Sequence, residues 1–306
     1  MPPAPPDAEL AARLAAAFPG ETIDAVAPLP GGRSGAAVHL VTVAGKEWVL
    51  RHQAASHGAP LTCLRIASER GIAPAVRYLD EDAGIVVMER VVAVPRQATG
   101  LTRIAQKLRH LHDGPALPGT ADVGVVLTNI DGILAQRGGA LPAEVVANVE
   151  HANALCRRFA ASAPCHNDLN PGNILEAADA TYFVDWDTAA MNDPFFDLGC
   201  LGVFRFAASP DREALLAAYL GREPTAEERA RTVATRVLAT GFYAAAFQMM
   251  SPTGKPVAPT LTLPEVLASF REAPMAFEIV AAAMAAEQAQ VRASAAYAEA
   301  ERLLGH

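Results

Sequence analysis

"CHNDLNPGNIL", residues 165–175, decides how the rest of the chain is interpreted. Asp168 stands five positions before Asn173, and the apolar segment "TYFVDWD" at 181–187 carries Asp185 twelve positions further on. Transfer of a phosphoryl group from a nucleotide requires a carboxylate near the attacking hydroxyl and oxygen ligands for Mg²⁺. We therefore expect Asp168 to be the catalytic base, and Asn173 and Asp185 to bind the metal.

The same loop has a plainer explanation, in which the side chains of a polar turn bond only to their own backbone. An isolated "HND" is typical of such a turn. Four features agree here, however: the histidine, the aspartate, the asparagine and an apolar strand that leads into an aspartate. This agreement favours the catalytic interpretation. His166 is expected to brace the loop by hydrogen bonding rather than to transfer protons.

Composition narrows the class of protein. The chain has 306 residues, 51% of them hydrophobic, so we expect one large domain or two lobes. Its net charge of −8 makes general binding to nucleic acid or to anionic membranes unfavourable. Its four cysteines show no paired or metal-like spacing, which fits reduced thiols in the cytoplasm. The N-terminus lacks a signal-peptide pattern. The most apolar stretch, 237–250, is too short to span a bilayer and predicts a buried helix.

Periodicity divides the chain into a β-rich and a helical part. After a short helix at 7–18, strand patterns occupy 22–29, 36–43, 47–52, 75–80 and 84–91, with one inserted helix at 60–71. Helical patterns dominate from 97 onward, including a capping box at Thr225 and Glu228 and an alanine-rich end expected to form one or two helices. We predict an α+β fold with a small β-rich lobe, residues 1–92, and a larger helical lobe, residues 93–306, that holds the polar loop.

A second motif, "PLPGGRSGAAV" at 28–38, is a candidate phosphate loop. Its glycines allow backbone N–H groups to approach an anion closely, although a Gly-Gly pair is also the usual hairpin connection. Its place shortly before the strand that carries Arg51 favours the phosphate role. Burying that arginine on a strand is costly without an anionic partner.

These segments, together with "YFVDWDTAAMNDPFFDLG", resemble the aminoglycoside phosphotransferase and choline/ethanolamine kinase superfamily, and most closely its bacterial choline-kinase branch. The resemblance runs from about Leu29 to Met250 and implies a protein-kinase-like fold of two lobes. It further implies ATP- and Mg²⁺-dependent transfer of the γ-phosphate to a hydroxyl of a small molecule, foremost an amino alcohol such as choline or ethanolamine. An aminoglycoside, another antibiotic or a sugar is the alternative acceptor. A non-catalytic nucleotide-binding protein is the alternative of another class, and the joint presence of Asp168, Asn173 and Asp185 argues against it.

The resemblance also implies roles for individual residues. Arg51 takes the place of the lysine that binds the ATP phosphates, the backbone near Glu89 and Val91 bonds adenine, and Leu175 lies beneath the base. Asp197 anchors the catalytic loop or, alternatively, caps a helix. The complete set assigned to ATP is Gly31, Gly32, Ser34, Gly35, Arg51, Glu89, Val91 and Leu175, and the residues assigned to the acceptor are Asn170, Asp187 and Tyr243.

The sequence departs from the superfamily in three places. Thr62 or nearby apolar residues stand where a helix glutamate normally pairs with the phosphate-binding cation, and Glu69 sits at the helix end. The glycine loop lacks the usual Thr-Asn pair. The aromatic box for a quaternary ammonium is poor in tryptophan, with only Trp186 in the second half. The other aromatic residues that could serve, or could simply form core, are Phe204, Phe206, Phe242, Tyr243 and Phe247. The oligomeric state is left open by the sequence.

Overall fold

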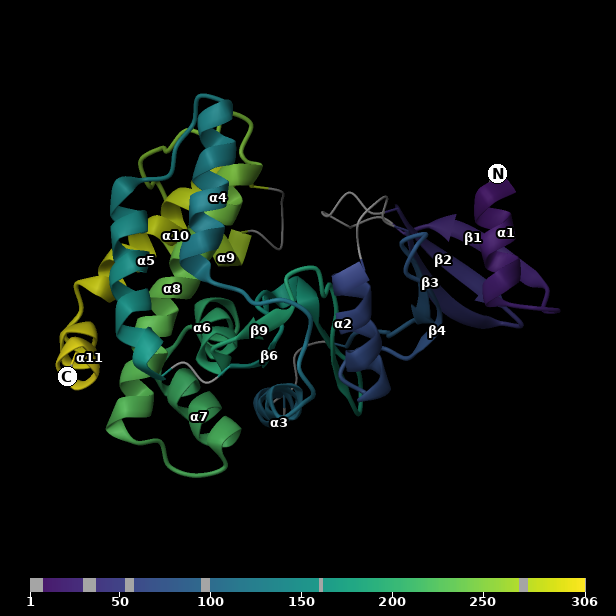
Figure 1. Ribbon diagram of the computed structural model, residues 1–306, viewed down its shortest axis with the longest axis horizontal. Helices are drawn as coiled ribbons and strands as arrows, with labels where there is room; N and C mark the ends of the chain where they lie inside the picture. Colours follow the sequence, from purple (N-terminus) through teal and green to yellow (C-terminus); the bar gives the residue numbers. More distant parts are fainter. Residues whose placement is uncertain are drawn as a thin grey trace. The chain divides into compact units, whose positions relative to one another are not determined.

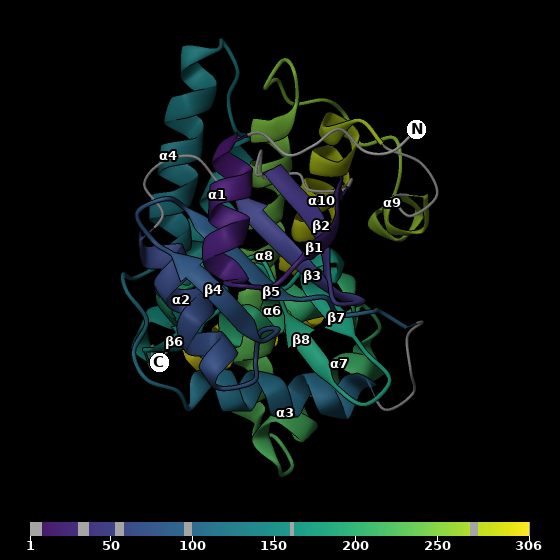
Figure 2. The same ribbon diagram turned by 90° about the vertical axis from the view of Figure 1, so that its right-hand side faces the viewer.

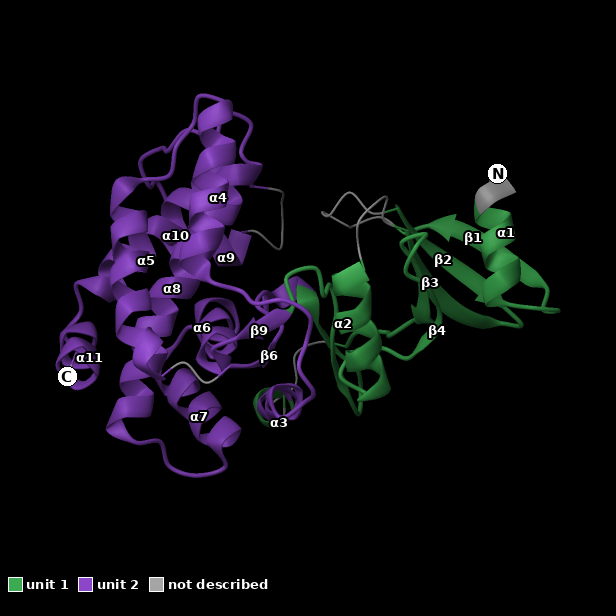
Figure 3. Ribbon diagram, in the orientation of Figure 1, with its two compact units in different colours: residues 1–103, 173–189 green, residues 104–172, 190–306 purple. Residues whose placement is uncertain are grey.

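The structure is a computed structural model that describes residues 8–29, 37–52, 58–94, 100–159, 162–269 and 275–305. It contains two compact units (Figure 3): unit 1 comprises Met1–Arg103 with Asn173–Ala189, and unit 2 comprises Ile104–Gly172 with Ala190–His306. A small antiparallel sheet lies in unit 1 and a mainly helical arrangement in unit 2, as the predicted α+β class requires. The predicted lobe boundary after residue 92 stays a prediction. The compact units divide after residue 103, and the segment 173–189 belongs to unit 1.

The sheet of unit 1 has five antiparallel strands in the order β1-β2-β3-β5-β4. Their bounds are Ile23–Pro28, Ala37–Val43 and Lys46–His52 for β1 to β3, then Val76–Asp80 for β4 and Ile85–Glu89 for β5. The β2–β3 hairpin turns at Ala44 and Gly45, whose φ angles are 49° and 74°. Two successive positive φ values are typical of a type I′ turn, whose twist matches that of the two strands it connects.

Two helices cover this sheet. Helix α1, Ala8–Ala17, lies over one face (Figure 1, Figure 2), where Leu14 and Phe18 pack with Val41, Leu50 and Val87 in one buried cluster. Helix α2, Gly58–Glu69, packs against β4 and buries Leu61, Cys63, Leu64 and Ala67. The apolar positions of α1 and of the strands β2, β3 and β5 thus meet in one core, which holds β3 in place.

The segment 173–189 joins unit 1 through a second, two-stranded sheet. Strand β7, Ile174–Glu176, pairs with β8, Thr181–Phe183, and the 3₁₀ turn η2, Pro171–Asn173, precedes them. Backbone hydrogen bonds attach the hairpin to the rest of the unit: Val94 N–H donates to the Glu176 carbonyl at 2.7 Å, and Phe183 N–H donates to the Ile72 carbonyl at 2.9 Å. The acidic end of the "TYFVDWD" segment therefore belongs to the same compact unit as β3.

Unit 2 is built around the long helix α8, Ala226–Met250, which contacts α4, α5, α6, α10 and α11 (Figure 1). The bounds are α3 Gly100–His112, which crosses the unit division, α4 Val123–Gln136, α5 Ala143–Cys156, η1 Arg157–Phe159, α6 Pro194–Phe204 and α7 Ser209–Leu220. Strands β6, Ala163–Cys165, and β9, Ala190–Asn192, form a short antiparallel pair. The polar loop follows β6 directly.

Helix α8 confirms two predictions. The Thr225 hydroxyl accepts the Glu228 N–H, and the Glu228 carboxylate accepts the Thr225 N–H, which is the predicted capping box. The apolar stretch 237–250 is largely buried within this helix. Among the described residues, no helix is long and apolar enough to cross a membrane.

Two helical predictions need correction. In the part of the alanine-rich end that the structure describes, 263–269 and 275–305, there are three helices rather than one or two: α9 Leu263–Ser269, α10 Phe277–Arg292 and α11 Ala295–Leu304. Ser294 separates the last two, because its side chain accepts the Tyr297 N–H and so caps a new helix. Helix α4 was not predicted; its signal is Asp122, whose carboxylate accepts the N–H groups of Gly124 and Val125.

Candidate active site

The β7–β8 hairpin brings the two predicted metal ligands onto neighbouring chain segments within unit 1. Val184 N–H donates to the Asn173 carbonyl at 3.0 Å, so Asp185 is the next residue beyond this bonded pair. Asp185 has a φ of 64°, a left-handed conformation that costs free energy for a residue with a Cβ and often marks functional positions. An amide oxygen and a carboxylate are ligands that suit Mg²⁺, which takes hard oxygen donors and completes its sphere with phosphate oxygens and water. The donor set therefore fits the metal.

Arg51 on β3 has two carboxylate partners from the segment after β8. Its Nη1 donates to Asp187 Oδ1 at 3.2 Å and its Nη2 donates to Asp187 Oδ2 at 2.7 Å. The same Nη2 lies 3.2 Å from Asp185 Oδ1. The Arg51 side chain is only 15% exposed, so these carboxylates supply the counter-charge that a sheltered guanidinium needs. Asp187, predicted to bind the acceptor, thus contacts Arg51.

The other residues assigned to the nucleotide fall into two groups. Glu89 ends β5, where its N–H donates to the Ala75 carbonyl at 2.8 Å and its carboxylate lies 2.7 Å from Lys46 Nζ. Val91 follows two positions later. Leu175 is half-buried in β7 and pairs with Tyr182. The glycine-loop residues Gly31, Gly32, Ser34 and Gly35 lie outside the described residues. All these nucleotide contacts remain predictions.

In unit 2, the carboxylate of Asp168 is held by two donors. Its Oδ1 accepts hydrogen bonds from Asn170 Nδ2 at 3.0 Å and from the Tyr243 hydroxyl at 2.9 Å. Tyr243 is 4% exposed, and burial raises its pKa well above the usual value, so its hydroxyl stays protonated and donates. The structure brings together Asp168, Asn170 and Tyr243. The latter two, predicted to contact the acceptor, orient the predicted base.

Asp197 on α6 ties down the start of the same loop. One carboxylate oxygen accepts the His166 N–H at 2.9 Å and the other accepts the Asn167 N–H at 2.7 Å. Asp197 is completely buried. The cap of α6 is a different residue, Asp193, whose side chain accepts the Phe195 N–H at 2.9 Å. Of the two roles considered for Asp197, these contacts correspond to the loop anchor.

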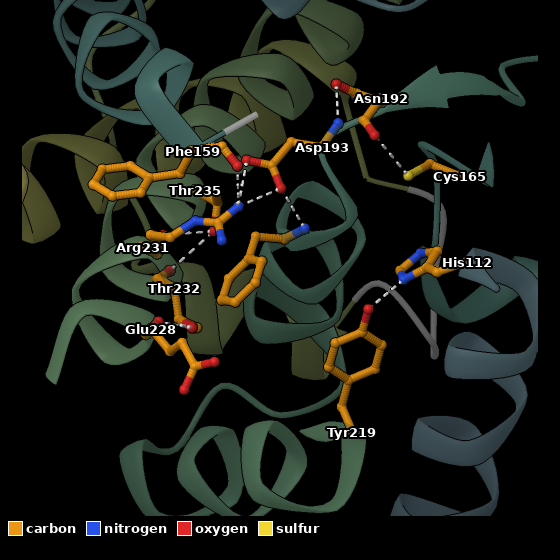
Figure 4. A network of polar contacts seen from close by, with 11 residues as sticks. His112, Phe159, Cys165, Asn192, Asp193, Tyr219, Glu228, Arg231, Thr232 and Thr235 are labelled. Carbon is orange, nitrogen blue, oxygen red and sulfur yellow. Dashed lines mark hydrogen bonds and ion pairs between the residues drawn. The ribbon is translucent and has the colours of Figure 1, made fainter. Parts of the chain in front are cut away.

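Two residues of this anchor were missed by the sequence interpretation. His112, at the end of α3, places Nδ1 2.8 Å from the Tyr219 hydroxyl (Figure 4). Its Nε2 lies 3.0 Å from Asp197 Oδ2. Because a carboxylate only accepts hydrogen bonds, Nε2 carries the proton and Nδ1 accepts from Tyr219. The available signal was a histidine at the end of an apolar-periodic helix, but nothing in the sequence indicates its partners.

The "MND" string supports the loop from a second side. Asn192 Nδ2 donates to Asn167 Oδ1 at 2.8 Å, and Asn167 is the residue directly before Asp168. Asp193 forms an ion pair with Arg231 of α8 at 2.9 Å (Figure 4), and the Arg231 guanidinium lies 3.9 Å from the centroid of the Phe195 ring. Helices α6 and α8 are thereby joined beside the loop.

Three of the aromatic residues considered for an ammonium site gather near Asp168 within unit 2. The rings of Phe204 and Phe242 lie edge-on to Tyr243, with centroid distances of 4.5 Å and 5.1 Å. Both phenylalanines are half-buried. Of the remaining candidates, Phe206 and Trp186 are 1% and 2% exposed, and Phe247 stacks with Phe277.

Comparison with known proteins places the chain among phosphotransferases. The family described as "Phosphotransferase enzyme family" matches residues 25–232. Protein LicA of Haemophilus influenzae is 47% identical over 38 residues, which span 12% of this chain and only 14% of LicA.

Several solved structures share the fold. A choline/ethanolamine kinase family protein from Mesorhizobium loti has a TM-score of 0.73 at 21% identity, covering 97% of this chain and 98% of that one. Choline kinase LicA from Streptococcus pneumoniae has a TM-score of 0.67 at 17% identity, covering 92% and 97%.

Proposed function

Because the chain belongs to the phosphotransferase enzyme family, we propose that it is an ATP- and Mg²⁺-dependent kinase of a small amino alcohol such as choline or ethanolamine. The observation that carries this proposal is the environment of Asp168. Its carboxylate accepts two hydrogen bonds, and the preceding loop residues are bonded to a buried carboxylate, Asp197. A merely structural polar turn does not require this support from α6 and α8.

Asp168 acts as the general base in the proposed reaction. As the acceptor oxygen attacks the γ-phosphorus, the bond to the β–γ bridging oxygen breaks and ADP leaves, while the proton of the acceptor hydroxyl passes to the Asp168 carboxylate. Hydrogen bonds from Asn170 and Tyr243 to Oδ1 fix the orientation of the carboxylate before the acceptor arrives. Because the transition state of phosphoryl transfer is loose, this positioning contributes at least as much as basicity.

The residues of unit 1 provide for the nucleotide. Asn173 and Asp185 would hold Mg²⁺, which neutralises charge on the phosphates when bound. Arg51 would donate to phosphate oxygens through its planar fork. The hairpin bond between Val184 and Asn173 supports this assignment, because it fixes both metal-binding positions on one rigid element.

The aromatic rings beside Tyr243 support an amino alcohol as the acceptor. Phe204 and Phe242 are half-buried, so part of each ring is accessible close to the tyrosine that contacts Asp168. A quaternary ammonium is attracted to such ring faces. A polycationic aminoglycoside would instead favour a cluster of acidic side chains.

An ATP-consumption screen tests this proposal. The wild-type protein is mixed with ATP, Mg²⁺ and one acceptor at a time: choline, ethanolamine, an aminoglycoside or a sugar. We expect ADP formation with choline or ethanolamine that disappears in EDTA and slows by about two orders of magnitude in Asp168→Asn. A matched control is Asp179→Asn, which removes an exposed carboxylate from the turn of the β7–β8 hairpin. Stimulation by the aminoglycoside or sugar alone would assign the acceptor differently, and ADP formation by Asp168→Asn at the wild-type rate would exclude the proposed base.

A further inference from the structure

We propose that Asp187 is a positioning residue that holds Arg51 ready for the nucleotide phosphates. The inference rests on the proposed function, because it assumes that Arg51 faces a nucleotide. It replaces the acceptor contact predicted for Asp187 from the sequence. It also names the acidic partner for which the sequence offered no candidate.

Arg51 and Asp187 form a bidentate ion pair. Both terminal nitrogens of Arg51 contact Asp187, each on its own carboxylate oxygen, at 3.2 Å and 2.7 Å. Two parallel hydrogen bonds fix the plane of a guanidinium as well as its position. The side chains are 15% and 28% exposed, so solvent screens the pair less than it screens a surface ion pair. Asp187 can therefore determine where Arg51 points.

Helix α2 offers no substitute for this carboxylate. Its only acidic residue is Glu69, at its last position, and Glu69 lies 3.1 Å from Arg65 of the same helix. Thr62 donates its hydroxyl proton to the Gly58 carbonyl, within the helix. The counter-charge for Arg51 consequently comes from the segment that follows β8.

Trp186 explains why two acids of this segment reach the same guanidinium. The indole is 2% exposed and its Nε1 donates to the Phe183 carbonyl at 3.1 Å, so the side chain is committed to the interior. The residues on either side of it, Asp185 and Asp187, both contact Arg51 Nη2. The buried indole thus fixes the backbone from which both carboxylates project.

The two acids differ in how firmly they hold Arg51. Asp185 makes one contact at 3.2 Å and is 40% exposed, whereas Asp187 makes two contacts and is 28% exposed. Asp185 is therefore the partner that can leave to bind Mg²⁺ when the nucleotide enters. A guanidinium has five N–H donors, and the pair with Asp187 uses two of them, so Arg51 can bind phosphate while Asp187 still holds it.

Binding of ADP, measured by calorimetry in EDTA and again with Mg²⁺, tests this role. In EDTA, Asp187→Asn should weaken ADP binding about tenfold while adenosine binding is unchanged, because only the phosphate contact depends on Arg51. Asp187→Asn added to Arg51→Met should have no further effect on ADP. Asp187→Glu should recover part of the loss, and the control Asp179→Asn should bind as the wild type does. In turnover assays, the KM for ATP should rise more than kcat falls.

Three results would overturn the inference. A loss that occurs only with Mg²⁺ present would make Asp187 a metal ligand. Tighter ADP binding by Asp187→Asn would make it a competitor of the phosphates. Additive losses in the double variant would show that it acts independently of Arg51. A different result would refute the proposed function: the wild-type protein would bind neither ADP nor ATP, with or without Mg²⁺. Fluorescence of Trp48 and Trp186, the two tryptophans of the chain, reports whether each variant keeps unit 1 folded.

Discussion

Replacing Asp197 by asparagine perturbs the loop anchor with the least possible change of shape. The side chain is completely buried and its two oxygens accept three hydrogen bonds, from His166 N–H, Asn167 N–H and His112 Nε2. Asparagine has one oxygen and one NH₂ group, so it cannot accept on both sides. Whichever way the amide lies, at least one buried backbone N–H of the loop faces another donor.

The magnitude follows from these contacts. An unpaired buried donor costs about 1–3 kcal/mol, and each remaining bond loses about 1 kcal/mol when its acceptor is no longer charged. A neutral amide is less costly to bury than a carboxylate, which offsets part of the loss. We therefore expect Asp197→Asn to lower the free energy of unfolding of unit 2 by about 3 kcal/mol. Because the loop carrying Asp168 is displaced, kcat should fall by about a hundredfold.

Urea unfolding followed by far-UV circular dichroism measures this loss, since most helices belong to unit 2, while tryptophan fluorescence follows unit 1. The matched control is Asp113→Asn, an exposed acid paired with Arg109 on the surface, which should change stability by less than 1 kcal/mol. If Asp197→Asn is no less stable than Asp113→Asn, or keeps wild-type kcat, Asp197 does not anchor the loop.

Three further predictions concern stability and reactivity. Hydrogen bonds from Arg222 lower the pKa of Glu228 from 4.5 to about 2, so the stabilising effect of Glu228 is present above pH 4.5 and is lost as the pH falls towards 2. Glu228→Gln should therefore be about 1 kcal/mol less stable than the wild type at pH 7. The stabilities of the two proteins should converge in acid, which urea titrations at several pH values will test. Burial raises the pKa of Cys63 to about 11, so iodoacetamide at pH 8 should label this thiol only after urea unfolding, as mass spectrometry of the peptides can verify. A Cβ on Gly199 would lie 2.7 Å from the Thr235 carbonyl of α8, so Gly199→Ala should cost about 1–3 kcal/mol; an unchanged melting temperature would mean that α6 and α8 approach less closely than described.

The sequence predicted those features that depend on local pattern. Alternating apolar positions gave the strands of the sheet, and Thr225 with Glu228 gave the start of α8. The loop around Asp168 could be recognised because its polar residues lie close together in the sequence, at 165–175. Helix α4 was not predicted because its glycines and β-branched residues weaken the helical pattern, and because Asp122 is a single capping residue without a capping box.

The partners of the site residues could not be predicted in this way. Arg51 and Asp187 are 136 positions apart, and Asp168 and Tyr243 are 75 apart. Periodicity reports which face of an element is buried, but not which distant side chain it meets. Tyr243 is an example: its place in an apolar helix indicated burial, whereas its contact with Asp168 follows only from the packing of α8 beside the loop.

Single-turnover phosphoryl transfer by Asp168→Asn tests the central claim most directly. Asparagine keeps the shape of the side chain and can still accept from Tyr243, but it cannot take a proton. With ATP, Mg²⁺ and choline or ethanolamine, we expect nucleotide binding close to that of the wild type and a transfer step slower by about two orders of magnitude, at the lower end of what a positioned base contributes. A variant that transfers phosphate at the wild-type rate would contradict the account, because Asp168 would then have a structural role only.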